Sequence, residues 1–581
     1  MFQSSSARSR VMKKVGAGIA LALLASTVPM AANAAKTTSS ASADKPVSGG
    51  KITVGVFDTF AGYCMKQILA NSALGGARSI AETLFERNSS GKVVPFLLKG
   101  ATPSADYKTW NLEIRKKDDG TPIQFSDGVA WNADALIANF NAFRGLVYVA
   151  NIKTDTEKNF FGSTAVATGN IVSTTKVDEY NVSVKLNMAQ ADLRELMYAS
   201  GRFIMRSPNM FKDSASCAST LVGTGPFVQQ SSEPTKLVVV KNENYWRQDA
   251  AGKKLPYLDQ ITFKYVLESA SRVAGLKSGS LDAAQFSSAS ETKQMKDLST
   301  SPAVSYFKTG GDFYPSLWFN TSIAPFNSLN ARKAVSFAID REFWAKTRGN
   351  GISEAATSIV GKNNIMYSTK NFPAFSLAKA KAAAAAYKTE TGTDLEFVFP
   401  SANDSSSRAN TKAFVAMMKK AGIKASYNEE LISDIVNKGF FEVGTGLKYQ
   451  AAFLLTLEGL DAAFNYIFLS SNMFETGTTN PIAGLARLAK IDNLLNITKH
   501  KDTQLDALLQ AARASGTAAD YKKVTERIQE QVYIANITYQ SYAMATTKKI
   551  FGVGQTKLAA GGSAPAVFNW GTNWTSVWKK K

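Results

Sequence analysis

The stretch from Val222 to Ala284 constrains the fold of this chain more than any other part of the sequence. It begins with the run Gly-Thr-Gly-Pro-Phe, which predicts a turn because glycine tolerates positive φ and proline fixes φ. Two strands are expected next, the first a short β-branched run at 237–240 and the second at 261–265, where apolar and polar side chains alternate. A helix then follows, and Gly279 is placed to end it. Strands and a helix in this order indicate an α/β fold.

The same stretch resembles the signature of the extracellular solute-binding proteins of family 5, the receptors of ABC importers. Members of that family typically carry a G-T-G-P turn followed by an aromatic residue, an N-x-x-Y-W loop, a D-x-I-x-F strand and an R-V-x-x-L-x-x-G-x-x-D helix. This chain has all four in the same order, at 223–227, 242–246, 258–263 and 270–282. A single glycine-rich turn would be weak support for the resemblance, whereas four ordered matches are strong support.

Shorter matches to the same family extend from Lys51 to Gly554. The segment 317–341 resembles the family pattern of an apolar strand, a P-F turn and a helix that ends in I-D-R, and it departs from that pattern at Ser328 and Lys333. The family turn F-x-D-G is present at 125–128, and Asn132 is placed to cap the helix that follows it. We expect these matches to belong to the scaffold rather than to the binding site.

The resemblance implies a two-lobed α/β periplasmic binding protein of the large class, which has an extra subdomain and hinge-connected mixed β-sheets flanked by helices. At 581 residues the chain is also too long for one hydrophobic core. The expected first lobe consists of residues 51–88, 220–311 and 541–581. The expected extra subdomain is 89–219, and the expected second lobe is 312–540, with an exposed alanine- and lysine-rich helix at 378–387.

Residues 1–34 have the pattern of a secretory signal peptide. An apolar run at 15–28 is too short for a comfortable membrane span, and Ala32-Asn33-Ala34 matches a cleavage site. The charged part before this run consists of Arg8, Arg10, Lys13 and Lys14. No cysteine directly follows the apolar run near the cleavage site, so we expect export to the periplasm without a lipoprotein anchor. Residues 35–50, rich in Ser, Thr, Ala and Gly, are expected to form a disordered leader.

The formal net charge is +21, and a strongly basic chain is able to bind nucleic acid, anionic membranes or acidic ligands. The basic residues are scattered, however, and no recognition helix or zinc finger is visible. We therefore expect a solvated basic surface and no nucleic-acid partner. Electrostatic steering of an anionic ligand is the alternative interpretation.

His500 is the only histidine, which excludes a metal site built from several histidines. A Ser-His-Asp triad would depend on it, and no G-x-S-x-G motif is present. Because its neighbours at 498–502 are polar, we expect an exposed histidine, no catalysis, no metal and no cofactor.

Cys64 and Cys217 are the only cysteines, and no C-x-x-C motif is present. An even pair of cysteines suggests a disulfide in an exported protein. The sequence leaves the pairing of these two open, because it does not show how far apart they lie.

The loop that follows the apolar strand at 451–455 is informative about the identity of the ligand. The family usually has the pattern W-x-x-D-x-P-D-P-x-x-F here, and the resemblance implies that this loop lines the ligand and holds a carboxylate for the amino terminus of a peptide. This chain lacks the tryptophan and both prolines but keeps Glu458 and Asp461. A buried ammonium group needs a charged partner, so either acid could orient a cationic group. The alternative is two acids on a loop surface, and the missing residues argue against ordinary short peptides.

The resemblance further implies ligand capture between two lobes by hinge closure, followed by delivery to an inner-membrane ABC permease. The ligand is expected to be an oligopeptide or a peptide-like molecule, bound by a monomer. The predicted ligand-binding residues are Phe57, Tyr63, Trp318, Thr456, Glu458, Asp461 and Tyr542. For the aromatic members of this set, packing in the core is the alternative.

Three other functions stay open. The same fold could bind a non-peptide solute such as a sugar or an acidic metabolite. A secreted hydrolase would need a nucleophile and a base, and His500 would have to be the base. A protein-binding envelope chaperone would use an exposed apolar groove instead of a small-ligand pocket.

Overall fold

The structure of the protein is a computed structural model. It describes residues 45–57, 62–63, 71–144, 167–212, 217, 219–310, 316–403, 405–431, 434–435, 438, 449–454, 461–471, 496–568 and 571–581. The expected signal peptide at 1–34 and most of the expected leader at 35–50 lie outside these residues. The described residues from Pro46 onward belong to one compact unit.

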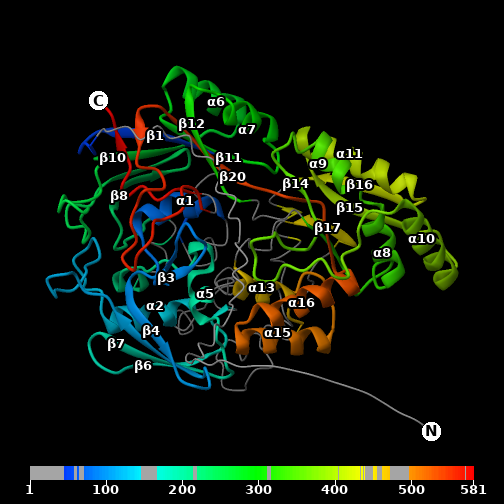
Figure 1. Cartoon of the computed structure of the whole chain (residues 1–581), viewed down its shortest axis with the longest axis horizontal. Helices are drawn as coiled ribbons and strands as arrows, with labels where there is room; N and C mark the ends of the chain where they lie inside the picture. Colours follow the sequence, from blue (N-terminus) through cyan, green and yellow to red (C-terminus); the bar gives the residue numbers. More distant parts are fainter. Residues whose placement is uncertain are drawn as a thin grey trace, which may run out of the picture. The chain divides into compact units, whose positions relative to one another are not determined.

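A seven-stranded sheet is the largest among the described residues, with the strand order β12-β20-β11-β1-β10-β9-β8 (Figure 1). Its strands are β1 (Lys51–Val56), β8 (Phe227–Glu233), β9 (Lys236–Lys241), β10 (Gln260–Tyr265), β11 (Ala283–Ser287), β12 (Val304–Lys308) and β20 (Tyr542–Thr547). The central strand β1 pairs in parallel with both β10 and β11. The strands predicted at 237–240 and 261–265 are confirmed as β9 and β10, which pair antiparallel with each other.

Three helices accompany this sheet: α1 (Asn71–Ile80), α6 (Ser269–Ser278) and α7 (Thr292–Ser299). Helix α6 ends where the sequence predicts, because Gly279 adopts a φ of 76°, which a side chain would disfavour. Helices α6 and α7 both contact β11, and α1 contacts β8. The resulting core contains the buried side chains of Ile52, Val54, Phe263 and Met544.

A four-stranded antiparallel sheet, in the order β4-β5-β7-β6, forms within residues 98–186. Its strands are β4 (Leu98–Pro103), β5 (Thr109–Ile114), β6 (Ile171–Lys176) and β7 (Asn181–Leu186). The small pair β2 (Phe85–Arg87) and β3 (Val93–Pro95) precedes it, and α2 (Ala133–Phe143) and α5 (Leu193–Tyr198) accompany it. Asn132 caps α2 as predicted, because its side chain accepts a hydrogen bond from the Ala135 amide.

The described residues between 316 and 539 form three further small sheets, in the orders β17-β13-β18, β15-β16 and β14-β19. Their strands are β13 (Ser316–Phe319), β14 (Glu354–Ala355), β15 (Glu396–Ala402), β16 (Lys424–Glu430), β17 (Ala451–Leu454), β18 (Ile534–Asn536) and β19 (Thr538–Tyr539). The helices are α8 (Leu329–Ala338), α9 (Arg341–Thr347), α10 (Leu377–Thr391), α11 (Ser405–Lys420), α13 (Ala462–Leu469), α15 (Thr503–Ser515) and α16 (Ala518–Gln531).

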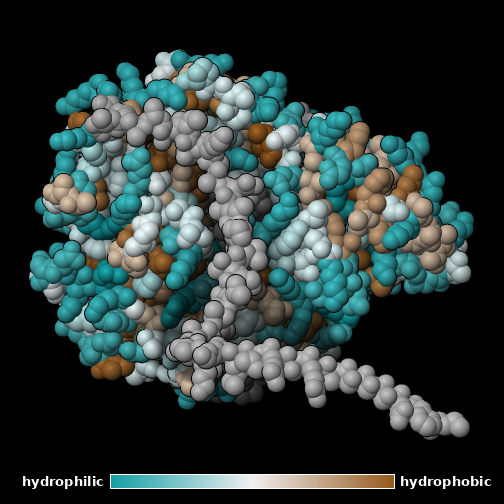
Figure 2. Space-filling model, viewed as in Figure 1, coloured by the Kyte–Doolittle hydropathy of each residue, from teal (hydrophilic) through white to brown (hydrophobic). Residues whose placement is uncertain are grey.

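The predicted alanine- and lysine-rich helix is confirmed as α10. Only Ala380 and Tyr387 are buried along it, so most of its surface faces solvent. It lies at the right in Figure 1, and the same region of Figure 2 shows the tan colour of its alanines among hydrophilic side chains. Its stability therefore depends on helix propensity more than on burial.

The chain crosses twice between the seven-stranded sheet and the sheets of residues 316–539. One crossing connects β12 to β13, and the other connects β19 to β20. The two crossings lie side by side, because the Thr309 amide donates to the Tyr542 carbonyl at 2.9 Å and the Tyr542 amide donates to Thr309 Oγ1 at 3.0 Å. Two neighbouring connections of this kind allow hinge motion between the two groups of sheets.

Glu82 joins the separate pieces of the stretch Val222–Ala284. Its buried carboxyl accepts hydrogen bonds from Thr224 Oγ1 at 2.9 Å, the Tyr245 hydroxyl at 2.6 Å and Trp246 Nε1 at 3.0 Å. The turn at 223–226 packs directly on the backbone before Glu82, since a Cβ on Gly225 would lie 2.6 Å from Ile80. The turn and the Y-W loop therefore contact the same buried group.

The first prediction concerns the pH dependence of folding. Burial raises the pKa of Glu82 to about 7, and hydrogen bonds from Tyr245 and Trp246 limit that rise. An unfolded glutamate has a pKa of about 4.3, so between about pH 4.5 and 7 the folded state keeps a proton that the unfolded state releases. The free energy of unfolding of the wild type should therefore fall as the pH rises through this window, by on the order of 3 kcal/mol from this group.

A Glu82→Gln variant cannot titrate and should lack this part of the decline, whatever its absolute stability. Urea unfolding at a series of pH values from 4.5 to 7.5 measures the difference. Glu243→Gln is the matched control, because Glu243 lies in the loop that contains Tyr245 and Trp246 but has a side chain that is 75% exposed. Identical pH slopes for wild type and Glu82→Gln would contradict the prediction.

Candidate functional site

A cavity of about 370 Å³ lies between residues that follow the seven-stranded sheet and residues of the second group of sheets. One wall is the connection from β11 to α7, at 288–293. The opposite wall comes from α9 and the turn after it, at 344–353, and from the end of β15 and the start of α11, at 400–411. Residues 537–540, in the crossing to β20, line it as well.

The position of this cavity follows from strand direction. Strand β11 runs parallel to β1, and β15 runs parallel to β16, and in both cases the lining residues follow the carboxyl end of the strand. Ligands of open α/β sheets bind outside the carboxyl ends of the strands, where loops rather than regular structure meet. The cavity is therefore the strongest candidate for a ligand site.

The lining is mainly polar. Hydroxyl and amide side chains dominate it, and its cations among the described residues are Lys293 and Arg348. None of the described lining residues is an aspartate or a glutamate. Apolar contact comes from Trp344, Phe453 and Ile537. Such a surface suits a polar ligand that needs many hydrogen-bond donors.

Hydrogen bonds connect the two walls of the cavity. Thr292 Oγ1, at the start of α7, donates to the Arg348 carbonyl at 3.0 Å and accepts from Asn350 Nδ2 at 2.7 Å. Arg348 Nε in turn donates to Asn410 Oδ1 on α11 at 2.9 Å. These bonds orient side chains from three different segments toward one space.

The predicted aromatic residues lie elsewhere. Trp318 is fully buried in β13, Tyr542 is buried in β20, and Tyr63 is buried with its pKa raised to about 12 by desolvation. Phe57 is half-buried, with the Arg272 guanidinium 5.6 Å from its ring. None of the four lines this cavity. Thr456 and Glu458 lie outside the described residues.

Sequence reasoning missed the residues that line the cavity. They are rich in Ser, Thr and Asn and occur directly after one strand, at 288–292, and at and after the end of another, at 400–411. A cluster of small polar residues after a strand of a parallel sheet is the signal that could have indicated them. Their convergence from segments more than 100 positions apart was not visible in the sequence.

Asp461 is paired with an arginine of the chain itself. It is 2% exposed and forms an ion pair with Arg87, which is the last residue of β2. The Arg87 guanidinium also lies 5.2 Å from the ring centre of Tyr198 on α5. Burial alone would lower the pKa of Arg87, but the Asp461 carboxylate outweighs this effect and raises it. Asp461, which the sequence predicts to orient a cationic group of the ligand, therefore pairs with Arg87 of the protein itself.

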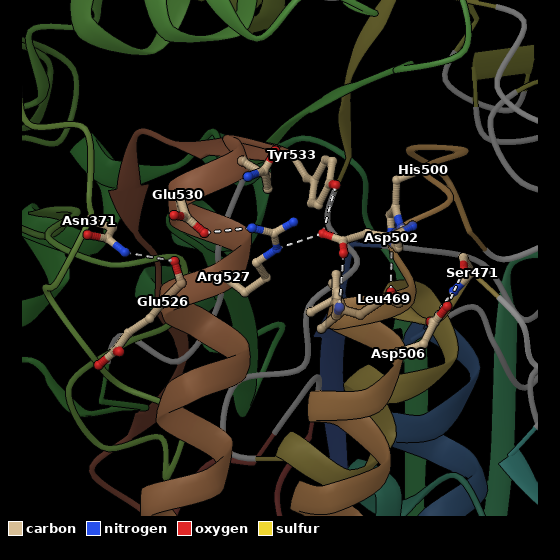
Figure 3. A network of polar contacts seen from close by, with 12 residues as sticks. Asn371, Leu469, Ser471, His500, Asp502, Asp506, Glu526, Arg527, Glu530 and Tyr533 are labelled. Carbon is tan, nitrogen blue, oxygen red and sulfur yellow. Dashed lines mark hydrogen bonds and ion pairs between the residues drawn. The ribbon is translucent and has the colours of Figure 1, made fainter.

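The expectation of an exposed His500 is wrong. The side chain is buried, and its ring stacks on Tyr533 with 4.6 Å between ring centres (Figure 3). Its Nε2 lies 2.8 Å from the Leu469 carbonyl, and its Nδ1 accepts from the Asp502 amide at 3.3 Å. Burial lowers the pKa of His500, which favours the neutral ring. Both ring nitrogens are engaged by backbone groups, so neither is placed to activate a serine.

Asp502 extends the polar network around this histidine. Its carboxylate accepts from Arg527 Nε at 2.8 Å, from the Tyr533 hydroxyl at 3.0 Å and from the Leu505 amide at 3.1 Å, where it caps α15. Figure 3 shows that the same arginine also contacts Glu530. The polar residues around His500 thus serve to join α15 to α16.

Cys217 is disulfide-bonded. The Tyr63 amide donates to its carbonyl at 2.8 Å, which places Cys217 beside the segment that contains the other cysteine of the chain. Cys64 itself lies outside the described residues.

Within the described ranges, no helix combines the length and apolar character needed to cross a lipid bilayer. In the same part of the chain, no three His, Cys, Asp or Glu side chains are grouped to hold a metal ion.

The geometry defines a class of protein. Two groups of sheets are joined by two neighbouring crossings, and a polar cavity lies between them at the ends of parallel strands. This is the architecture of a two-lobed binding protein that encloses a small solute.

The chain belongs to the bacterial extracellular solute-binding proteins, family 5. The model of the middle part of that family matches residues 92–452, which is more than half of the chain. The nickel-binding periplasmic protein of Escherichia coli (strain K12) is 25% identical over 284 residues, which are 48% of this chain and 49% of that relative. The glutathione-binding protein GsiB of Salmonella choleraesuis (strain SC-B67) is 25% identical over 403 residues, which are 68% of this chain and 73% of that relative. The match thus spans about half the length of the nickel-binding relative.

Solved structures share the fold along nearly the whole chain. AgaA from A. tumefacien R10, in complex with agropinic acid, has a TM-score of 0.72 at 18% identity and covers 92% of this chain and 99% of its own. The oligopeptide-binding protein AppA from Bacillus subtilis, in complex with a nonapeptide, has a TM-score of 0.69 at 16% identity and covers 92% of this chain and 100% of its own. The predicted family and fold class are therefore confirmed, and the relatives are solute-binding receptors.

The second prediction concerns the ion pair of Asp461. An Asp461→Asn variant leaves the buried Arg87 without its counter-charge, and removing one member of a buried pair typically costs about 3–5 kcal/mol of unfolding free energy. Urea unfolding measures the loss. The double variant Arg87→Met, Asp461→Leu should be less destabilised than Asp461→Asn, because it leaves no uncompensated charge.

Glu113→Gln is the control for the second prediction. It removes one member of the exposed pair between Lys99 and Glu113 and should change stability by less than about 1 kcal/mol. An Asp461→Asn variant as stable as this control would show that the pair with Arg87 is not formed in solution.

Proposed function

We propose that this protein captures a small solute in the cavity described above and delivers it to the membrane permease of an ABC importer. The observation that carries the proposal is the cavity itself, which lies at the carboxyl ends of strands from two groups of sheets and beside their two crossings. Membership in the solute-binding family supports the same function.

Hinge closure is the proposed mechanism. A change of backbone angles in the two neighbouring crossings would separate the walls of the cavity and admit a ligand. A ligand that contacts both walls shifts the population toward the arrangement in which they meet. Exclusion of water then strengthens each polar contact, because the local dielectric constant falls.

Contacts outside the cavity would also have to break when its two walls separate. The Tyr521 hydroxyl on α16 donates to the buried carboxylate of Asp192, just before α5. Arg513 Nη2 on α15 donates to Gln190 Oε1 at 2.8 Å, and the Ala191 amide donates to the Arg513 carbonyl at 2.8 Å. These bonds, together with the pair of Arg87 and Asp461, would hold the closed arrangement.

The proposed ligand is a peptide or peptide-like molecule, with a sugar or an acidic metabolite as the alternative. Relatives and structural neighbours are described as binding glutathione, a nonapeptide, agropinic acid and nickel. His500 offers no nitrogen to a metal, since both of its ring nitrogens contact backbone groups. The proposed location is the periplasm, which the protein would reach through the signal peptide expected at 1–34 and where it would act as a monomer without a lipid anchor.

The third prediction tests the cavity. Native mass spectrometry of protein purified from its own periplasm should show a retained small mass that is released by mild denaturation. Ala289→Trp should abolish this retention while the protein stays folded, because Ala289 is a half-buried lining residue and an indole would fill the space.

Ala382→Trp is the matched control for this prediction. It makes the same change on the exposed face of α10, which does not line the cavity, and should retain the small mass. Equal retention by both variants would place the ligand elsewhere. An empty spectrum together with no rise in unfolding temperature across peptides, sugars and acids would contradict small-solute capture, since a ligand of the native state must stabilise it.

A further inference from the structure

The cavity carries positive charge on both of its walls. Lys293 lies on α7, which packs on β11 of the seven-stranded sheet. Arg348 follows α9, in the part of the chain after the first crossing. The two are held near each other, because Thr292, the neighbour of Lys293, donates its hydroxyl to the Arg348 carbonyl at 3.0 Å. Both walls of the cavity therefore contribute a cation to its lining.

The protein itself compensates these charges weakly. Lys293 pairs with Asp297 one turn along α7, but both side chains are more than half exposed, and water screens such a pair. Arg348 donates its Nε to the neutral amide of Asn410 and forms no ion pair with a described residue. Asp461, the acid that the sequence assigned to the ligand, is bound to Arg87 instead.

We infer that the ligand carries an anionic group, a carboxylate, that binds between Arg348 and Lys293. This inference rests on the proposed function, and it assigns a chemical class to the ligand of that cavity. The guanidinium offers a planar pair of donors that matches a carboxylate, and the ammonium adds a second charge from the opposite wall. Hydroxyl groups of the lining supply further donors.

The same arrangement makes closure depend on the anion. Arg348 and Lys293 repel each other when closure brings the two walls together, and this repulsion opposes closure of the empty cavity, although water around the exposed Lys293 side chain screens it. A carboxylate between them reverses the sign of the interaction, so it stabilises the closed form more than the open form. A neutral ligand of equal shape would leave the repulsion in place.

Two sources of a carboxylate are compatible with the cavity, the end of a peptide or the acid group of a sugar acid. The probes are therefore two matched pairs, trialanine with trialanine amide and gluconate with glucose. Calorimetric titration of the full mature protein at low ionic strength measures the dissociation constants. The acid of at least one pair should bind about ten- to hundredfold more tightly than its neutral partner, which is the range for a hydrogen-bonded charge. The pair that responds identifies the source.

Variants connect this preference to the two cations. Arg348→Gln and Lys293→Gln should weaken binding of the acid by about tenfold or more each, with little change for the neutral partner. Arg348→Lys should retain part of the preference, because it keeps the charge. Lys296→Gln is the matched control, since Lys296 is an exposed lysine of the same helix that does not line the cavity, and it should bind like the wild type.

The outcomes separate the inference from the proposed function. Equal binding of acid and neutral partner, or an acid preference that survives in Arg348→Gln, overturns the inference. If Ala289→Trp still abolishes binding of both probes, capture of a solute in the cavity is supported, but without a preference for an anion. If none of the four probes binds and the native mass spectrum shows no retained mass, both the inference and the proposed function are overturned.

Discussion

The buried carboxyl of Glu82 is the interaction on which the rest of this structure depends. A carboxyl group removed from water is strongly unfavourable unless hydrogen bonds replace its hydration. Here Thr224, Tyr245 and Trp246 supply those bonds, and the amide of Met205 donates to the Glu82 carbonyl at 2.7 Å. Glu82, which follows α1, thus determines where the turn before β8, the loop after β9 and Met205 must lie. The turn at 223–226 and the loop at 242–246, two of the separated motifs of the stretch Val222–Ala284, thus have one physical reason to occur together.

The cavity is a consequence of the frame that these contacts hold. With β1 in the centre of the seven-stranded sheet, β11 delivers the residues at 288–293 to the same edge at which the chain crosses to and from the second group of sheets. The parallel pair of β15 and β16 delivers a second polar loop to the opposite wall. Lys293 and Arg348 both line this cavity although neither belongs to a sequence motif. The scaffold therefore positions a site that combines buried lining residues, such as Ser288 and Thr538, with exposed or half-buried ones, such as Lys293 and Arg348.

The sequence predicted the elements that depend on local chemistry. The strands at 237–240 and 261–265, the cap at Asn132 and the helix end at Gly279 are all present, because turn residues and alternating burial act over a few positions. Even the departure at Ser328 is explained locally, since its hydroxyl accepts from the Asn330 amide and caps α8 as an aspartate would. His500 was predicted incorrectly because its polar neighbours turn inward: Asp502 caps α15 and binds Arg527 and Tyr533, which are 25 and 31 positions away.

By itself, the sequence determined the α/β class, the solute-binding family and the positions of the turn and strands in the stretch Val222–Ala284. Each of these depends on short-range backbone preferences and on motifs within one stretch. Only the tertiary structure decided which charges are paired and which line the cavity. Asp461 is separated from Arg87 by 374 positions, and no local pattern indicates that these two residues meet. The same is true of Lys293 and Arg348, which approach one cavity from two sides. Pairing of charges depends on distance and burial in three dimensions, and these are properties of the folded chain.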